Sequence, residues 1–293
     1  MATAAPAILG FAAGIAGTVS AFAAKYAFDF RLGKRRLELD ERAGLATTLG
    51  GRPGQLRRAS IRLTDRIEAF FRDAPSLRSW LRPASSTRQD GYFLRSSVQR
   101  VFMFLSWSTL MQQSLDSLPA ETLRARRDLQ YQYALLDVSI SVLTSIAMFP
   151  AFPGYPTDRA EYNLFTGTVD ELADLGVAAH NRNAQVIPSS EFIEAYDKPE
   201  RMMYQLREWI SFMRADDTRS AVVKTRFACL AAVLEEVVQP GRHASFSNNT
   251  VLHARLAGLE SSAGGYQLVT VIPHWMETQL TEALDRWPAR SDR

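Results

Sequence analysis

The sequence predicts an all-α protein in which a single N-terminal transmembrane helix precedes a multi-helix cytosolic domain. Three observations lead to this fold class. The first 24 residues carry no charged side chain, apolar residues recur at helical spacing through most of the remaining chain, and an alternation of strands with helices is absent. We divide the 293 residues into a transmembrane anchor (1–30), basic juxtamembrane helices with a linker (31–88) and a helical cytosolic domain (89–293).

The N-terminal segment is long enough to cross a bilayer once. Its apolar run begins at Ala7 and, extended beyond Ala24 to Phe30, passes the roughly 20 residues that a bilayer core requires. A secretory signal carries positive charge before its apolar run, whereas here the first charge, Lys25, follows it. Two alternatives stay open: the "VSAFAA" stretch imitates a cleavage site, and a helix that is apolar all round also suits a soluble core.

Positive charge after the anchor predicts its orientation. Lys and Arg are enriched on the cytoplasmic side of membrane helices, so we expect the N-terminus outside and the bulk of the chain in the cytoplasm, at the inner (cytoplasmic) membrane. The residues expected to face lipid headgroups are Lys25, Arg31, Lys34, Arg35 and Arg36. Residues 1–130 hold 20 Lys and Arg against 11 Asp and Glu, a net charge of +9, which predicts membrane lipid as a partner.

Nucleic acid is the competing partner for the Arg-rich stretch Gly54–Arg72. Its acids, Asp65 and Glu68, dilute the positive charge, so a solvated helix face near lipid is the favoured interpretation.

Small residues recur along the predicted anchor at spacings of 3, 4, 3, 4 and 3, from Ala7 to Ala24. The residues expected to pack against another helix are Gly10, Gly14, Gly17 and Ala21. Such a stripe lets two membrane helices approach closely, and it predicts a homo-oligomer. The alternative is that the stripe follows merely from an alanine-rich composition.

Two further helices are expected before a candidate domain boundary. Residues 30–49 are expected to continue as a helix that stops at Gly50–Gly54, a strong breaker. The following helix is predicted to bury Leu56, Ser60, Leu63, Ile67 and Phe70. The polar loop Arg82–Gly91 then separates the membrane-proximal region from the main domain.

Two apolar helices open the main domain. Tyr92–Leu115 is expected to bury Leu94, Val98, Val101, Phe102 and Leu105. The helix Ala120–Phe149 starts polar and ends apolar. Apolar runs of this length favour core helices over further spans, although contact of Tyr92–Leu115 or Ala134–Phe149 with the membrane stays open. If they were spans, Asp137 would become a functional candidate.

The second half of the chain reads as further helices. A capping box at Thr168 and Glu171 is expected to open one helix, and Cys229 lies in a buried apolar helix. The inward positions of two helices are predicted as Met203, Leu206, Ile210 and Met213, and as Val223, Phe227, Leu230, Leu234 and Val237. Gly264–Pro273 is the one plausible strand, for which a helical extension or a loop is favoured because a single strand forms no sheet.

No catalytic or phosphate-binding motif is present, and none of the four histidines lies three or four residues from another His or Cys. We therefore predict no metal and no cofactor. The weak catalytic candidates are His180, Arg182 and Asp170. "AAHNRNA" (178–184) is interpreted as a helix C-terminal end, and the Glu235–Glu236 pair as solvated.

The favoured function is a non-enzymatic scaffold, sensor or effector that self-associates on the cytoplasmic face of a membrane, with a protein partner as a further possibility. A membrane-anchored enzyme whose site comes from distant residues is one alternative, because fold class alone excludes no chemistry. A membrane-disrupting effector is the other.

Overall fold

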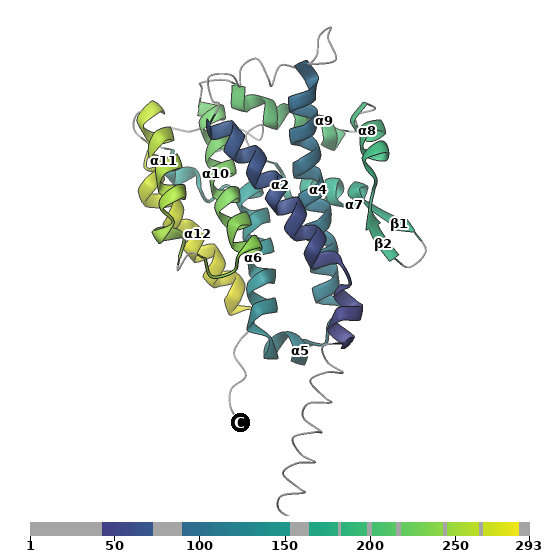
Figure 1. Cartoon of the computed structure of the whole chain (residues 1–293). Coiled ribbons are helices and arrows are strands. Elements are labelled where there is room, and N and C mark those ends of the chain that lie inside the picture. Colours follow the sequence, from purple (N-terminus) through teal and green to yellow (C-terminus); the bar gives the residue numbers. More distant parts are fainter. Residues whose placement is uncertain are drawn as a thin grey trace, which may run out of the picture. The chain divides into compact units, whose positions relative to one another are not determined.

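The computed structural model describes residues 43–72, 90–152, 164–180, 183–197, 201–214, 218–242, 245–263 and 266–286 (Figure 1). The chain divides into two compact units, Met1–Gly50 and Gly51–Arg293. In the first unit, residues 43–49 form a helix that ends at Gly50, where φ is +53° and the amide donates to the Ala46 carbonyl at 2.9 Å. Glycine readily adopts a positive φ at a helix end. The break predicted at Gly50–Gly54 is therefore confirmed at Gly50 and Gly51, whereas the residues from Arg52 already belong to the next helix.

The second unit is built from helices, which confirms the all-α class. They are α2 (Arg52–Arg72), α4 (Asp90–Asp116), α5 (Ala120–Ala125), α6 (Arg127–Thr144), α7 (Thr166–Gly176), α8 (Ser189–Asp197), α9 (Arg201–Ser211), α10 (Thr218–Val238), α11 (Thr250–Ala263) and α12 (Leu268–Asp285). Short 3-10 turns lie at Phe149–Ala151, Phe212–Arg214 and Phe246–Asn248. One small hairpin, β1 (Val177–His180) with β2 (Asn183–Val186), adds to the helical body.

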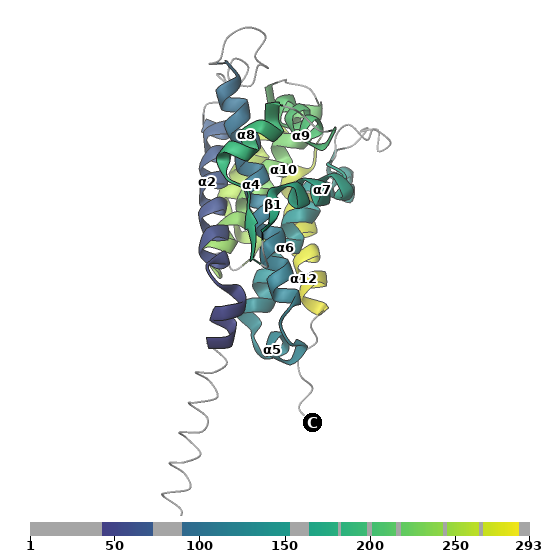
Figure 2. The same cartoon turned by 90° about the vertical axis from the view of Figure 1, so that its right-hand side faces the viewer.

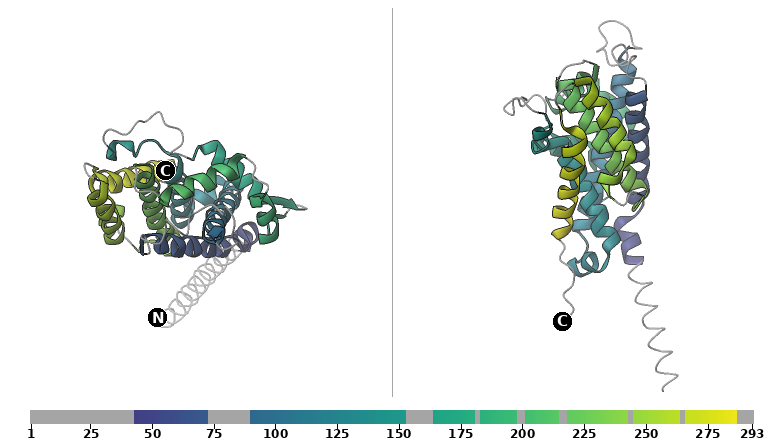
Figure 3. Two further views of the ribbon diagram at one scale, coloured as in Figure 1. Left: turned by 90° about the horizontal axis from the view of Figure 1, so that it is seen from above. Right: turned by 90° about the vertical axis from the view of Figure 1, so that its left-hand side faces the viewer.

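Helix α2 lies across α4 and α10 (Figures 1 and 3). Its apolar residues recur every three or four positions, so they share one face, and that face is buried as predicted. The buried residues include Leu56, Ser60, Leu63, Ile67 and Phe70. Because α2 belongs to the compact unit that starts at Gly51, part of the predicted juxtamembrane segment 31–88 is a structural element of the bundle.

Helix α10 is the central helix of this unit. It contacts α2, α6 and α11, and its residues are buried almost all round from Ala221 to Leu234. A helix that is apolar on every side is a core helix. The stripe predicted on this helix is buried, and in Figure 2 α2 and α12 lie on opposite sides of the central helices.

Aromatic side chains join four helices in the core. The Phe70 ring on α2 meets Phe93 on α4 and Phe227 on α10 edge-on, each at 5.6 Å between ring centroids. Trp209 on α9 lies 5.2 Å from Phe227. Such contacts add roughly 0.5–1.5 kcal/mol each beyond the burial of area, so α2 is held by the centre of the core.

The helices α4 and α6 are core helices, as the sequence predicted. The single helix predicted over Ala120–Phe149 is wrong in its bounds, because the segment forms α5 and α6 with a break at Arg126, and α6 ends at Thr144. The expected inward residues of α4 are buried, and so are Ala134, Val138 and Val142 on α6. Within the ranges that the structure describes, no helix combines the length and apolar character needed to cross a bilayer. The predicted anchor, including the packing residues Gly10, Gly14, Gly17 and Ala21 and the basic flank from Lys25 to Arg36, lies outside those ranges.

The region after α7 differs from the prediction. Helix α7 ends at Gly176, and the next residues pair as an antiparallel hairpin in which Val177 faces Val186 and His180 faces Asn183. The interpretation of residues 178–184 as a helix C-terminal end is therefore wrong. The helix ends where Val177 turns to an extended conformation, with φ −105° and ψ 96°. At its last residue, Gly176, α7 meets α4 so closely that a Cβ would collide with Ser106 Oγ.

Two further expectations have clear outcomes. The prediction that a capping box at Thr168 and Glu171 opens this helix is wrong, because α7 begins at Thr166. Thr168 lies buried inside the helix, and its hydroxyl donates to Gln205 Oε1 at 2.8 Å. The preference for a helix over a strand at Gly264–Pro273 is confirmed for the residues from Leu268, which form the start of α12. Pro273 is accommodated within this helix.

Candidate functional site

The weak catalytic candidates fall on separate elements. Asp170 lies on the solvent-exposed face of α7, and His180 ends β1 opposite Asn183. Arg182 lies outside the described residues. The structure therefore places two of the three candidates and assigns them to different elements.

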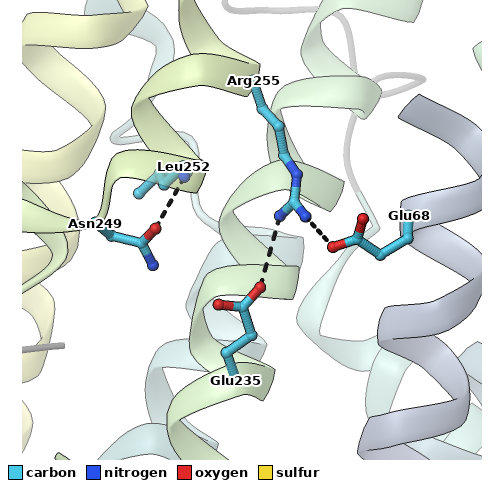
Figure 4. Close-up of polar contacts among 5 residues, drawn as sticks. All are labelled: Glu68, Glu235, Asn249, Leu252 and Arg255. Atoms are coloured by element: carbon cyan, nitrogen blue, oxygen red, sulfur yellow. Dashed lines mark hydrogen bonds and ion pairs between the residues drawn. The ribbon is translucent and has the colours of Figure 1, made fainter. Parts of the chain in front are cut away.

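A buried charge cluster that the sequence analysis missed joins α2, α10 and α11. The Arg255 guanidinium donates to Glu68 Oε1 and lies 4.0 Å from Glu235 Oε1 (Figure 4). The side chain of Arg255 is 8% exposed and that of Glu235 is 11% exposed, whereas Glu68 is 40% exposed. One guanidinium thus faces two carboxylates, one of them at the solvent boundary, and links three helices.

The start of α11 positions Arg255 for this contact. The side-chain oxygen of the fully buried Asn249 accepts a hydrogen bond from the Leu252 amide at 2.9 Å (Figure 4). This bond satisfies an N–H group that a helix start leaves without an intrahelical partner. Arg255 follows on the next turn, on the side of α11 that faces α10 and α2.

The Glu235–Glu236 pair is not solvated, which corrects the sequence-based interpretation. Glu236 is 2% exposed, and its Oε2 accepts bonds from the Tyr131 hydroxyl at 3.3 Å and the Gly241 amide at 2.9 Å. Burial, together with the charge of Glu236, raises the pKa of Tyr131 to about 12. Glu236 on α10 therefore links α6 and the turn that follows α10 through hydrogen bonds. Tyr131 stays protonated at neutral pH.

A third polar cluster lies where α4, α6 and the end of α12 meet. Asp137 accepts bonds from Gln112 Nε2 at 3.0 Å and from Arg286 Nη1 at 2.7 Å. Burial raises the pKa of Asp137, and the Arg286 charge opposes that rise. Burial, with the nearby Asp116, also raises the pKa of Tyr133 on the same helix. Asp137 is thus a half-buried acid inside the bundle, not an intramembrane charge in any described span.

Two buried arginines act on backbone and aromatic groups. Arg226, fully buried on α10, donates to the carbonyls of Val142 at 2.5 Å and Ser145 at 2.8 Å. These carbonyls end α6 and lack helical partners, so Arg226 caps that helix from outside. Arg66 on α2 donates to Ser96 Oγ at 2.8 Å on α4.

Opposing influences act on the charge of Arg66. Its guanidinium lies 4.1 Å from the centre of the Phe93 ring, which favours the charged form. Burial, and then the charge of Arg100, lower the pKa of Arg66 to about 10. Arg66 stays charged at neutral pH, so positive charge accumulates where α2 meets α4.

Cys229 is buried in α10, as the sequence predicted. Burial raises the pKa of its thiol to about 12, so the thiolate needed for nucleophilic chemistry is negligible at neutral pH.

The three charged clusters and the two buried arginines share one arrangement. In each of them a charged side chain from one helix meets polar groups of another, and an ionised group buried in this way must be paired or hydrogen-bonded to be tolerated. Within the described part of the chain, no group of three or more His, Cys, Asp or Glu side chains is placed to hold a metal ion. These contacts therefore describe how the bundle is held together.

The positions of charged residues in the sequence of α10 could have indicated these clusters. Arg226 and the pair Glu235–Glu236 flank the apolar run 227–234 of α10, and a charged residue beside such a buried run has to find a partner. The partners themselves could not be found, because Glu68 and Arg255 lie 187 residues apart.

No family model, curated protein or solved structure matches this chain.

Proposed function

We propose that this protein is a membrane-tethered helical scaffold or effector, anchored through residues 1–30 in the cytoplasmic membrane, with its helical bundle in the cytoplasm. The observation that carries the proposal is the uncharged stretch of residues 1–24 followed by the basic flank from Lys25 to Arg36. That order of apolar and positive residues favours a retained anchor with the N-terminus outside.

The character of the bundle supports a binding role over a chemical one. Its buried charged side chains, such as Arg255 and Glu236, are engaged in contacts between helices. Such contacts fix the relative positions of the helices and give the bundle a defined outer surface. Self-association through Gly10, Gly14 and Gly17 would bring several such surfaces together at the membrane.

Membrane fractionation of the full chain tests the anchor. We expect the protein to sediment with membranes and to stay there through a high-salt wash, because an inserted helix is held by burial and not by charge. The substitution Ile15→Arg should release it, since a central Arg opposes insertion by about 2.5–3.5 kcal/mol.

The matched control is Ile15→Leu, which keeps the segment apolar and should leave the protein in the membrane fraction. A reporter fused after Arg293 should behave as cytoplasmic. Recovery of the unaltered full chain in the soluble fraction, or a reporter on the outer side, would contradict the proposal.

A further inference from the structure

A basic surface runs along the outer side of α2 and the adjoining edge of α4. We call it the α2–α4 basic face and define it by Arg58, Ile61, Arg62, Tyr92 and Arg100. Arg58 and Arg62 are exposed and lie one turn apart on α2. Arg100 on α4 donates to the Arg62 backbone carbonyl at 2.8 Å, which places the Arg100 guanidinium beside α2 at the position of Arg62.

The positive charge of this face is not neutralised by ion pairs with other residues that the structure describes. Within the described ranges, Arg58, Arg62 and Arg100 form no ion pair, whereas Arg95, Arg126, Arg255 and Arg286 each face a carboxylate. The charged Arg66 lies directly behind the face, near Arg100. Asp65 is the nearest acid on the outer side of α2, so the face keeps a net positive charge.

Two large apolar side chains are exposed within the same face. Ile61, between Arg58 and Arg62, is 38% exposed, and Tyr92 on α4 is 69% exposed. Exposed apolar groups flanked by arginines fit the boundary between lipid headgroups and acyl chains, where the guanidinium groups contact phosphates. Tyrosine is also enriched at this depth of a membrane.

We propose that the α2–α4 basic face docks on anionic lipid headgroups of the membrane that holds the anchor. This inference rests on the proposed tethering, because a tether raises the effective concentration of the face at the lipid surface. About 30 residues of chain separate the end of the predicted anchor from Ile61. The favoured ligand is a phospholipid with net negative charge, since charge complementarity supplies most of the attraction.

A probe at position 61 of the full chain tests the docking. Native Cys229 is buried and protonated, so a cysteine introduced by Ile61→Cys can be labelled selectively with a polarity-sensitive fluorophore. The labelled protein is reconstituted into phosphatidylcholine vesicles with or without phosphatidylglycerol. We expect a blue shift, and quenching by lipid-borne quenchers, only in the phosphatidylglycerol vesicles, with loss of both at high salt.

The matched probe site is Val251→Cys on α11, because Val251 is 39% exposed and so resembles Ile61 in accessibility. Its fluorescence should not respond to lipid charge. The double variant Arg58→Gln/Arg62→Gln should lower the ratio of docked to free probe about fivefold per arginine, as expected for charges near an anionic surface. Removing two exposed arginines elsewhere, Arg124→Gln/Arg127→Gln, should leave the ratio unchanged.

Flotation of the same samples separates this inference from the proposed anchor. A chain that floats with both kinds of vesicle while the position-61 probe stays in water would overturn the docking and leave the anchor standing. A chain that floats only with phosphatidylglycerol vesicles would support the face and contradict the anchor. A probe that responds to single-stranded RNA and not to phosphatidylglycerol would overturn the lipid assignment in favour of nucleic acid.

Discussion

At the scale of single residues, Gly176 is the position where one added methyl group has the clearest expected effect. Its missing Cβ lets α7 meet α4, and an alanine there would collide with the Oγ and Cβ atoms of Ser106 at 1.8 and 2.8 Å. Ser106 is fully buried and its hydroxyl donates to the Phe102 carbonyl, so it has little room to move. We expect Gly176→Ala to lower the free energy of unfolding by about 1–3 kcal/mol in a urea titration.

The same substitution on α11 provides the control. A Cβ at Gly258 would meet no atom within 4 Å, so Gly258→Ala should raise the free energy of unfolding by roughly 0.5–1 kcal/mol, because alanine favours the helix. If the two alanine variants changed stability equally and in the same direction, the close approach of α7 to α4 would be wrong.

The raised pKa of Asp137 predicts that the free energy of unfolding depends on pH. Burial raises its pKa above the ordinary value of 3.8, so the folded protein holds this proton more tightly than the unfolded chain does. The contribution of Asp137 to stability therefore grows as pH falls through the raised pKa towards 3.8, and it is least favourable at neutral pH. We expect Asp137→Asn to stabilise the protein at pH 7, by less than about 1.4 kcal/mol for each unit of pKa shift.

Urea unfolding of both proteins at pH 7 and at pH 3 measures this difference, which should shrink at the lower pH as Asp137 of the unaltered chain becomes protonated. A variant that is less stable than the parent at pH 7 would mean that the Arg286 ion pair, at 2.7 Å, outweighs the cost of burial.

At the scale of elements, we predict that the smallest stable bundle has to include α2. A chain starting at Gly51 should unfold cooperatively, whereas one starting at Tyr92 should not. The shorter chain loses Leu56, Leu63, Ile67 and Phe70, each at most 2% exposed. Burying such side chains contributes about 1.5–3 kcal/mol each, a total comparable with the whole stability of a domain. Circular dichroism during thermal unfolding distinguishes the two chains, and equal cooperativity would instead support a domain that begins near residue 89.

Which elements the sequence could predict depends on how local their cause is. The inward faces of α2, α4, α9 and α10 follow from spacing within one helix, and they were predicted correctly. The β1–β2 hairpin was missed because the same polar residues, "AAHNRNA", suit both the end of a helix and a hairpin turn. The cluster around Arg255 was missed because its two partners, Glu68 and Glu235, lie on other helices that are distant in the sequence.

At the scale of the whole molecule, the charge distribution and the predicted anchor point towards the same membrane surface. Residues 1–130 carry a net charge of +9 and the remaining residues −6, as the overall +3 requires. Under the proposed tethering, attraction to an anionic leaflet would act on the N-terminal part of the sequence, which contains the anchor flank and the α2–α4 basic face.

Assembly in the membrane gives the last prediction. If Gly10, Gly14 and Gly17 face another copy of the same helix, Gly14→Ile should hold the two backbones apart and weaken self-association, as read by crosslinking in membranes. Ala12→Ile places the same side chain off the stripe, where it faces lipid and favours insertion slightly. The contrast between these two positions separates packing from hydrophobicity, because both variants gain the same apolar group. Equal crosslinking of the two variants would mean that the stripe is a by-product of composition, and assembly would then have to come from the bundle.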